Sequence, residues 1–140
     1  MRWPARLHCV GKHPRIVLDC AHAPDAAAAL VDSLKSYFRY QRLWFVVGMS
    51  EDKDVAGFAR QLSRVDAETL LCQARLPRAL PAHQLRERAK PFWDEAECFN
   101  STEQAVRAAR ERAGRDDLIC ITGSVYVVGE AMESLGIEPF

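Results

Sequence analysis

Hydrophobic positions along the chain follow two different periods. The run Leu43–Gly48 contains no polar residue, which is typical of a strand buried on both faces of a parallel sheet. From about Pro24 to Phe38, apolar residues recur every three or four positions and predict an amphipathic helix that covers a sheet. Strand and helix patterns alternate along the whole chain. This order predicts an α/β domain with a mostly parallel sheet and helices on both faces.

The pattern places six strands and five helices. The strands are Arg6–Val10, Arg15–Asp19, Leu43–Gly48, Glu68–Cys72, Glu95–Phe99 and Asp117–Thr122. The helices are about Pro24–Phe38, Asp54–Ser63, Pro81–Phe92 (with Pro91 bending or ending it), Thr102–Ala113 (with a Ser101 and Gln104 capping box) and Val125–Gly136. The first two strands are separated by a short turn that contains glycine and proline, so they form a hairpin. We therefore predict one domain over residues 1–140, in which Arg6–Val10 is the only antiparallel strand and lies at the edge of the sheet.

Composition excludes several classes of protein. Lys plus Arg and Asp plus Glu are 19 each, so a formal net charge of zero favours neither nucleic acid nor an acidic membrane as a partner. No apolar run reaches the roughly 18 residues of a membrane span, and the first residues lack the apolar core of a signal peptide. We expect a soluble, cytoplasmic protein.

Cysteine and histidine spacing does not indicate a metal site. The five cysteines form no Cys-x-x-Cys pair, and four of them lie in or at the end of apolar runs, which is typical of reduced, mostly buried thiols. A zinc cluster could be imagined from His8, Cys9, His13, Cys20 and His22. Their spacing matches no usual set of zinc ligands, so we expect no metal site.

The stretch Ile16–Asp25 is the strongest local candidate for a functional site. A strand leads into Asp19 and His22 and then into a helix, and ligands of parallel α/β domains bind at the carboxyl ends of strands. Pro24 suits the first helical position, where a missing N–H costs nothing. Asp19 and His22 could equally be helix caps, and this stretch alone leaves both interpretations open.

Two more polar loops, Met49–Asp54 and Gly123–Ser124, follow predicted strands. In a doubly wound sheet these loops and Asp19–Ala23 gather at one edge. Amides at Gly123 and Ser124 open a helix and could hold a carboxylate or phosphate. The chain contains neither GxGxxG nor GxxxxGK[ST], so it has no recognisable means of binding nucleotide phosphates by itself.

Five short motifs stand along the chain: WPARL, LDCAHAPD, VVGMSEDKD, LPRAL and TGSVYVVGEA. In order and spacing they resemble the motifs of the carboxy-terminal domain of folylpolyglutamate synthase and dihydrofolate synthase, members of the Mur ligase superfamily. The family pattern is close to WPGRLE, LDGAHNP, VVG…DKD, PRA and TGSLYLVGE. The resemblance covers nearly the whole chain.

This resemblance implies a Rossmann-like fold within a three-domain ligase. Such an enzyme uses ATP and Mg²⁺ to activate a folate carboxylate as an acyl phosphate, which the amino group of glutamate attacks. The carboxy-terminal domain helps to bind glutamate and closes over the nucleotide. Since the amino-terminal ATPase domain and the folate-binding segment are absent here, the resemblance implies that the isolated chain is inactive and binds no cofactor.

The resemblance also implies roles for individual residues. Asp19 and His22 would be catalytic and lie near the acyl phosphate and the amino acid. The implied substrate-binding residues are Ser124, Lys53, Asp54 and Arg78. We expect the side chains of Asp19, His22 and Ser124 to share one face and to point to solvent.

Two residues depart from the family pattern. Ala23 stands where the family has Asn, which removes an amide able to hydrogen-bond a ligand, and Cys20 stands where it has Gly. Two hypotheses stay open: the glutamate-binding domain of a folate-type ligase, or a stand-alone, non-catalytic module that kept the fold. Fold alone does not separate them. Nor does the chain identify the acceptor, because dihydropteroate or folate would be recognised largely by the missing part.

Overall fold

The computed structural model describes residues 7–137 and contains every predicted strand and helix. The strands are β1 (His8–Val10), β2 (Arg15–Leu18), β3 (Leu43–Val47), β4 (Glu68–Leu71), β5 (Glu97–Cys98) and β6 (Leu118–Thr122). The helices are α1 (Pro24–Tyr37), α2 (Val55–Leu62), α3 (Ala82–Arg88), α4 (Thr102–Arg112) and α5 (Val125–Ser134). Arg6, the predicted start of the first strand, and most of the WPARL motif lie outside the described residues.

The six strands form one sheet in the order β1-β2-β6-β3-β4-β5. Only β1 and β2 pair antiparallel, and all other neighbouring strands pair parallel, which confirms the predicted topology. Ile16 lies opposite Ile119 and Leu18 opposite Ile121, so the strands that lead into the first and last polar loops are adjacent. One isolated antiparallel bridge, between Ser50 and Ala79, lies outside the strands.

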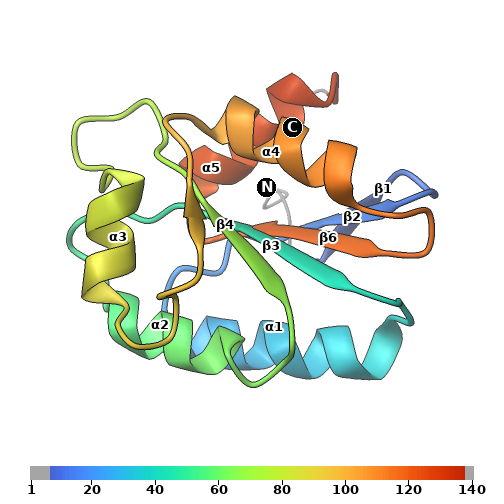
Figure 1. Ribbon diagram of the computed structural model, residues 1–140, viewed down its shortest axis with the longest axis horizontal. Coiled ribbons are helices and arrows are strands. Elements are labelled where there is room, and N and C mark those ends of the chain that lie inside the picture. The colour runs from blue at the N-terminus through green and yellow to red at the C-terminus, as the bar shows by residue number, and fades with distance from the viewer. Residues whose placement is uncertain (1–6, 138–140) are drawn as a thin grey trace, which may run out of the picture.

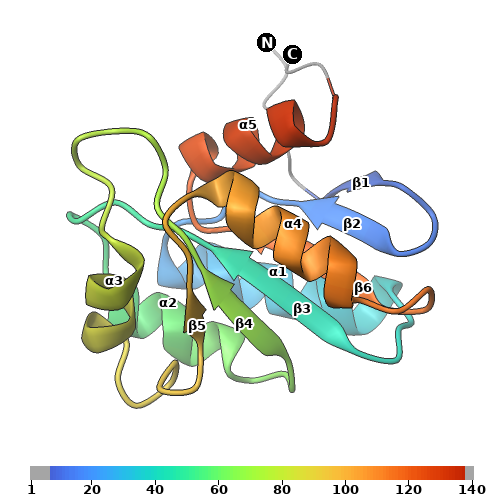
Figure 2. The same cartoon turned by 45° about the horizontal axis from the view of Figure 1, so that its top comes forward.

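Helices cover both faces of the sheet (Figure 1). Alternate residues of each strand point to opposite faces, so Val17, Phe45 and Cys120 belong to a core with α1, α2 and α3. Their strand neighbours, such as Trp44 and Ile119, belong to a second core with α4 and α5. Figure 2 shows α4 and α5 together on this second face. The uninterrupted apolar runs of the sequence thus reflect a sheet buried on both sides.

Helix α4 begins at the predicted cap, although the capping box is only half formed. Ser101 Oγ accepts a hydrogen bond from the Gln104 amide at 3.1 Å. The Gln104 side chain accepts from the amide of Asn100 rather than from that of Ser101. A reciprocal box requires the bond to Ser101 itself, so the prediction was correct only for the serine.

Helix α3 is shorter than predicted, since it ends at Arg88 rather than near Phe92. Pro91 has no amide to donate within a helix, and the residue before a proline is disfavoured in the helical conformation. The helix therefore stops before Lys90. The strand that follows is also shorter than predicted, because Glu95 belongs to a turn and the Ala96 amide donates back to the Trp93 carbonyl at 3.0 Å.

Candidate functional site

Three polar loops meet at the carboxyl edge of the sheet, as predicted. Strand β6 lies between β2 and β3, so the loop that follows it touches both neighbours. The Asp19 amide donates to the Ile121 carbonyl at 3.0 Å, and the Gly123 amide donates to the Ala21 carbonyl at 2.9 Å. Thr122 Oγ1 also donates to Ala21, at 3.4 Å. These bonds fix the turn after β2 against the turn after β6.

Two glycines of the family-like motifs allow this close approach. Gly123 has a φ of +110°, and a Cβ there would collide with the carbonyl oxygen of Gly48. A Cβ on Gly48 would lie 2.7 Å from Val127 Cγ2 of α5. Both positions therefore require glycine for the end of β3, the end of β6 and the start of α5 to pack together.

Asp19 is a buried residue that holds backbone amides. Its Oδ1 accepts from the Ala21 amide at 2.9 Å, and its Oδ2 accepts from the Leu7 amide at 3.1 Å. The residue is only 8% exposed, so the prediction that its side chain points to solvent was wrong. A carboxylate directly after a strand readily bonds the amide two residues later, which competes with a role toward ligand.

Ser124 is likewise buried, at 8% exposure, and it is the N-cap of α5. Its Oγ accepts from the Val127 amide at 3.0 Å, so the expected solvent-facing hydroxyl is wrong for this residue too. Because the Gly123 amide already donates to Ala21, it is not available for an anion as the sequence suggested. The serine instead sets where α5 begins.

His22 is exposed, as predicted, and it does not cap the helix. Its Nδ1 lies 3.0 Å from the Cys20 carbonyl, which only accepts, so Nδ1 carries the proton in this contact. The N-cap of α1 is Ala23, which makes no side-chain capping bond. His22 lines a hollow of about 410 Å³ together with alanines of α1 and Val125 of α5. Of the two candidate catalytic side chains, only that of His22 is exposed, so its Nε2 can face a ligand.

Thiols near this edge are poor nucleophiles. Burial, and secondly the negative charge of Asp19, raise the pKa of Cys20 to about 11. Burial raises the pKa of Cys72 to about 12 and that of Cys120 well above its ordinary value. All five cysteines are free, and Cys9 is the exposed one. Within residues 7–137, no group of three or more His, Cys, Asp or Glu side chains is arranged to hold a metal ion.

The loop after β3 brings two of the predicted binding residues together. Lys53 Nζ lies 3.9 Å from Asp52 Oδ2, and Arg78 Nη2 lies 3.6 Å from the same oxygen. Asp54 instead caps α2, because its Oδ1 accepts from the Gly57 amide at 3.0 Å. Asp52 lies within the motif that carries the resemblance, so the sequence could have indicated it.

Arg88 stabilises this loop from α3, a role that no sequence pattern indicated. Its guanidinium donates to the carbonyls of Glu51 at 2.8 Å and Lys53 at 3.1 Å. The Glu51 amide in turn donates to the Arg78 carbonyl at 2.8 Å. Arg88, which is 35 positions after Lys53, thus binds the Glu51–Lys53 segment directly. That segment is in turn bonded to the backbone of Arg78.

The loop after β2 and the loop after β3 adjoin through the starts of α1 and α2. A Cβ on Gly57 would lie 2.9 Å from Pro24 Cγ, so these two helix starts are in contact. The His22 turn is therefore next to the Asp54 cap. All six predicted site residues lie at the carboxyl edge, although three of them are engaged in holding the backbone.

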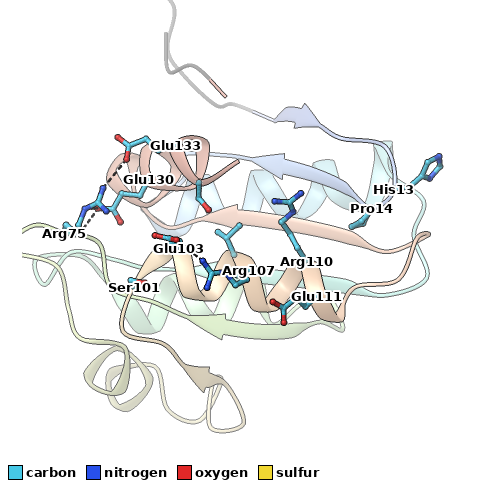
Figure 3. A pocket seen from close by; sticks show the side chains of 12 residues that line it. His13, Pro14, Arg75, Ser101, Glu103, Arg107, Arg110, Glu111, Glu130 and Glu133 are labelled. Carbon is cyan, nitrogen blue, oxygen red and sulfur yellow. Dashed lines mark hydrogen bonds and ion pairs between the residues drawn. The ribbon is translucent and has the colours of Figure 1, made fainter. Parts of the chain in front are cut away.

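A larger groove, of about 760 Å³, lies elsewhere, along α4 and α5 (Figure 3). Several of its charged groups pair with each other: Arg75 with Glu130 and Glu133, and Arg107 with Glu103. None of the six predicted site residues lines it. Among the described residues, no helix has both the length and the apolar character needed to cross a membrane.

Comparison with known proteins confirms the resemblance. The sequence model of the family "Mur ligase, glutamate ligase domain" matches residues 5–125. The dihydrofolate synthase/folylpolyglutamate synthase of Escherichia coli is 33% identical over 130 residues, which are 93% of this chain and 30% of that protein. The folylpolyglutamate synthase of Lacticaseibacillus casei is 35% identical over 138 residues, 95% of this chain and 30% of that protein.

Solved structures agree in fold. Escherichia coli FolC in complex with DHPP and ADP has a TM-score of 0.87 and 32% identity, over 96% of this chain and 31% of that one. A bifunctional folylpolyglutamate synthase/dihydrofolate synthase with Mn, AMPPNP and L-glutamate bound has a TM-score of 0.87 and 33% identity, over 97% of this chain and 32% of that one. This chain spans about 30% of the length of these two curated relatives. It belongs to the family of Mur ligase glutamate ligase domains.

Proposed function

We propose that this domain is the glutamate-binding, carboxy-terminal part of an ATP-dependent ligase that adds glutamate to a folate or pteroate carboxylate through an acyl phosphate. The observation that carries the proposal is the meeting of three polar loops beside the exposed His22. Support also comes from the relatives, which are named as folate-type ligases, and from a related structure described with L-glutamate bound.

His22 is the catalytic residue in this proposal. Its Nδ1 donates to the Cys20 carbonyl, which fixes the ring and directs Nε2 outward. With a second proton on Nε2, the imidazolium can donate from Nε2 to the anionic acyl phosphate and partly neutralise it while the amine attacks. Asp19 acts behind it as a positioning residue, because it binds the amides of Leu7 and Ala21 and so keeps the turn in place.

Lys53 and Arg78 are the proposed contacts to glutamate. The amino acid carries two carboxylates, and the structure offers two cations held on either side of Asp52. Both cations are partly or largely exposed, so exchanging Asp52 for a substrate carboxylate costs little. Asp54 and Ser124 contribute by starting α2 and α5 at this edge.

Nucleotide and Mg²⁺ are not assigned to these residues. Residues 7–137 include no suitable metal-binding group, and the sequence has no phosphate-binding loop. We therefore assign ATP and Mg²⁺ to protein outside the span of this chain, and we expect residues 1–140 alone not to hydrolyse ATP. Magnesium-dependent ATP turnover that persists through repurification of the isolated chain would contradict this assignment.

A non-catalytic binding module is the second candidate, and Ala23 favours it. This residue is exposed beside His22 and offers no side-chain hydrogen bond to the helix or to a ligand. The residues encoded before this domain distinguish the two candidates. A GTNGKGS-like phosphate-binding loop there would support the ligase, and an immediate stop codon would support the module.

The ligase proposal is tested by substituting His22 in a protein that includes this domain and whatever is encoded before it. We expect His22→Ala to lower kcat at least about tenfold, because charge stabilisation of the transition state is lost, with little change in the free energy of unfolding. His83→Ala is the matched control, since His83 is an exposed histidine on α3. Equal activity of the His22 and His83 variants, or unfolding of the His22 variant alone, would refute the assigned role.

A further inference from the structure

Cations without a partner gather at the end of the sheet opposite the candidate site. Over residues 7–137, most lysine and arginine side chains contact a carboxylate, a backbone carbonyl or an aromatic ring, as in the pairs Arg42–Glu68, Arg64–Asp32 and Arg112–Glu97. The side chains that make no such contact are those of Lys12, Lys35, Arg39, Arg110 and Arg115. They come from segments far apart in sequence.

These segments lie together at the amino ends of the parallel strands. In Figure 1 the β1–β2 turn, the α1–β3 connection and the α4–β6 connection all lie at the right-hand end of the sheet. Figure 3 shows Arg110 on α4 and His13 in the β1–β2 turn toward the same end of their groove. Strand β3 has five residues, so about 16 Å of sheet separates this end from the carboxyl edge.

A hollow of about 440 Å³ opens among these cations. The basic side chains that line it are Lys12, His13, Arg15, Arg39 and Arg115. Arg15 is fixed in place, because its Nη2 donates to the Arg39 carbonyl at 2.8 Å and its guanidinium lies 5.3 Å from the centre of the Phe38 ring. A planar guanidinium held in this way keeps further N–H groups available for an anion.

The two carboxylates in the lining offset only part of the charge of its four Lys and Arg side chains. Asp117 is buried, and both of its oxygens are occupied: Oδ1 accepts from the Arg42 amide, and Oδ2 accepts from Trp44 Nε1 and the Gly114 amide. Burial alone would raise the pKa of Asp117, yet these hydrogen bonds lower it. Asp116 is then the only exposed acid in the lining, against four Lys and Arg side chains.

Helix dipoles account for part of this pattern only. Lys35 lies in the last turn of α1 and Arg110 in the last turn of α4. The negative end of the helix dipole favours a cation at these positions. Lys12, Arg39 and Arg115 lie outside the helices. Those three are the partnerless cations that line the hollow.

We propose that this hollow binds a small multivalent anion, with closely spaced phosphates or carboxylates bridging Arg15, Arg39 and Arg115. The geometry favours more than one charge, because the guanidinium-bearing residues come from three separate segments around one opening. The ligand class is therefore an oligophosphate or an oligocarboxylate. This site is separate from the carboxyl edge, and the proposal does not depend on the ligase function.

Calorimetric titration of the 140-residue chain with sodium tripolyphosphate, and separately with tri-γ-glutamate, tests the proposal at low and moderate salt. We expect saturable binding of at least one probe, with a Kd below about 1 mM in low salt. The double variant Arg39→Ala/Arg115→Ala should raise that Kd at least about tenfold. Neither side chain has a partner, so this variant should keep the native circular dichroism spectrum.

A matched double variant, Arg60→Ala/Lys90→Ala, removes the same charge near α2 and α3 and should leave the Kd within about twofold. Binding of tripolyphosphate alone assigns an oligophosphate ligand, and binding of tri-γ-glutamate alone assigns an oligocarboxylate. The proposal is overturned if neither probe binds saturably, or if the two double variants weaken binding equally.

Discussion

Helix α1 begins without a side-chain cap, and supplying one should stabilise the domain. Ala23 is the N-cap, with φ −123° and ψ 157°, an extended conformation that asparagine adopts readily at this position. The Ala27 amide bonds the Ala23 carbonyl, while Pro24 has no amide. The amides of Asp25 and Ala26 are left for a capping side chain. In Ala23→Asn, the new Oδ1 can accept from one of them.

The expected gain follows from measured N-cap energetics. Exchanges between alanine and asparagine at an N-cap change stability by about 0.5–2 kcal/mol, typically about 1. A 140-residue chain has an unfolding entropy of about 0.3 kcal/mol/K, so a gain of about 1 kcal/mol raises Tm by about 3 °C. Ala23 is exposed, and no core packing is disturbed.

Urea unfolding and thermal melts followed by circular dichroism measure this change. Ala29→Asn is the matched control, because Ala29 is exposed in the interior of the same helix and asparagine there should cost about 0.6 kcal/mol. Ser101→Ala removes an existing cap from α4 and should cost about 0.5–2 kcal/mol. If Ser101→Ala destabilises as expected but Ala23→Asn is neutral or destabilising, the first turn of α1 is not short of a cap.

The fold could be predicted from sequence because its determinants are local and repeated. Apolar runs such as Leu43–Gly48 indicated strands buried on both faces, and the helix between each pair of later strands required parallel crossovers. Element ends were less predictable. The predicted strand Glu95–Phe99 is only Glu97–Cys98 in the structure, because Glu95 belongs to the preceding turn and the Ala96 amide bonds the Trp93 carbonyl.

The site was predictable in position but not in the direction of its side chains. Where Asp19 points depends on the amide of Leu7, twelve residues away on the approach to β1, and no local pattern reveals that contact. Ser124 could have been identified as a helix cap from the residues that follow it. Arg88 was not predictable, because its acceptors are backbone carbonyls, which any residue carries.

Three further predictions test the energetics of the fold. Leu18→Ala should lower the free energy of unfolding, measured with urea, by about 2–5 kcal/mol, since truncating this fully buried side chain removes apolar contacts and leaves a cavity. A loss below about 1 kcal/mol would contradict its place in the core. Ellman's reagent should modify the exposed Cys9 promptly, and Cys20 and Cys72 only slowly, because their raised pKa values keep them as thiols; three equally fast thiols would refute that order. For Asp117, the folded pKa lies below the ordinary value of 3.8, so its carboxylate stabilises the fold above that pH and the contribution is lost as pH falls through the folded pKa. Asp117→Asn has no such proton to bind, and its unfolding free energy should therefore decline less between about pH 5 and pH 2 than that of the parent chain. Parallel pH profiles would show that the hydrogen bonds from Trp44, Arg42 and Gly114 do not favour the ionised carboxylate.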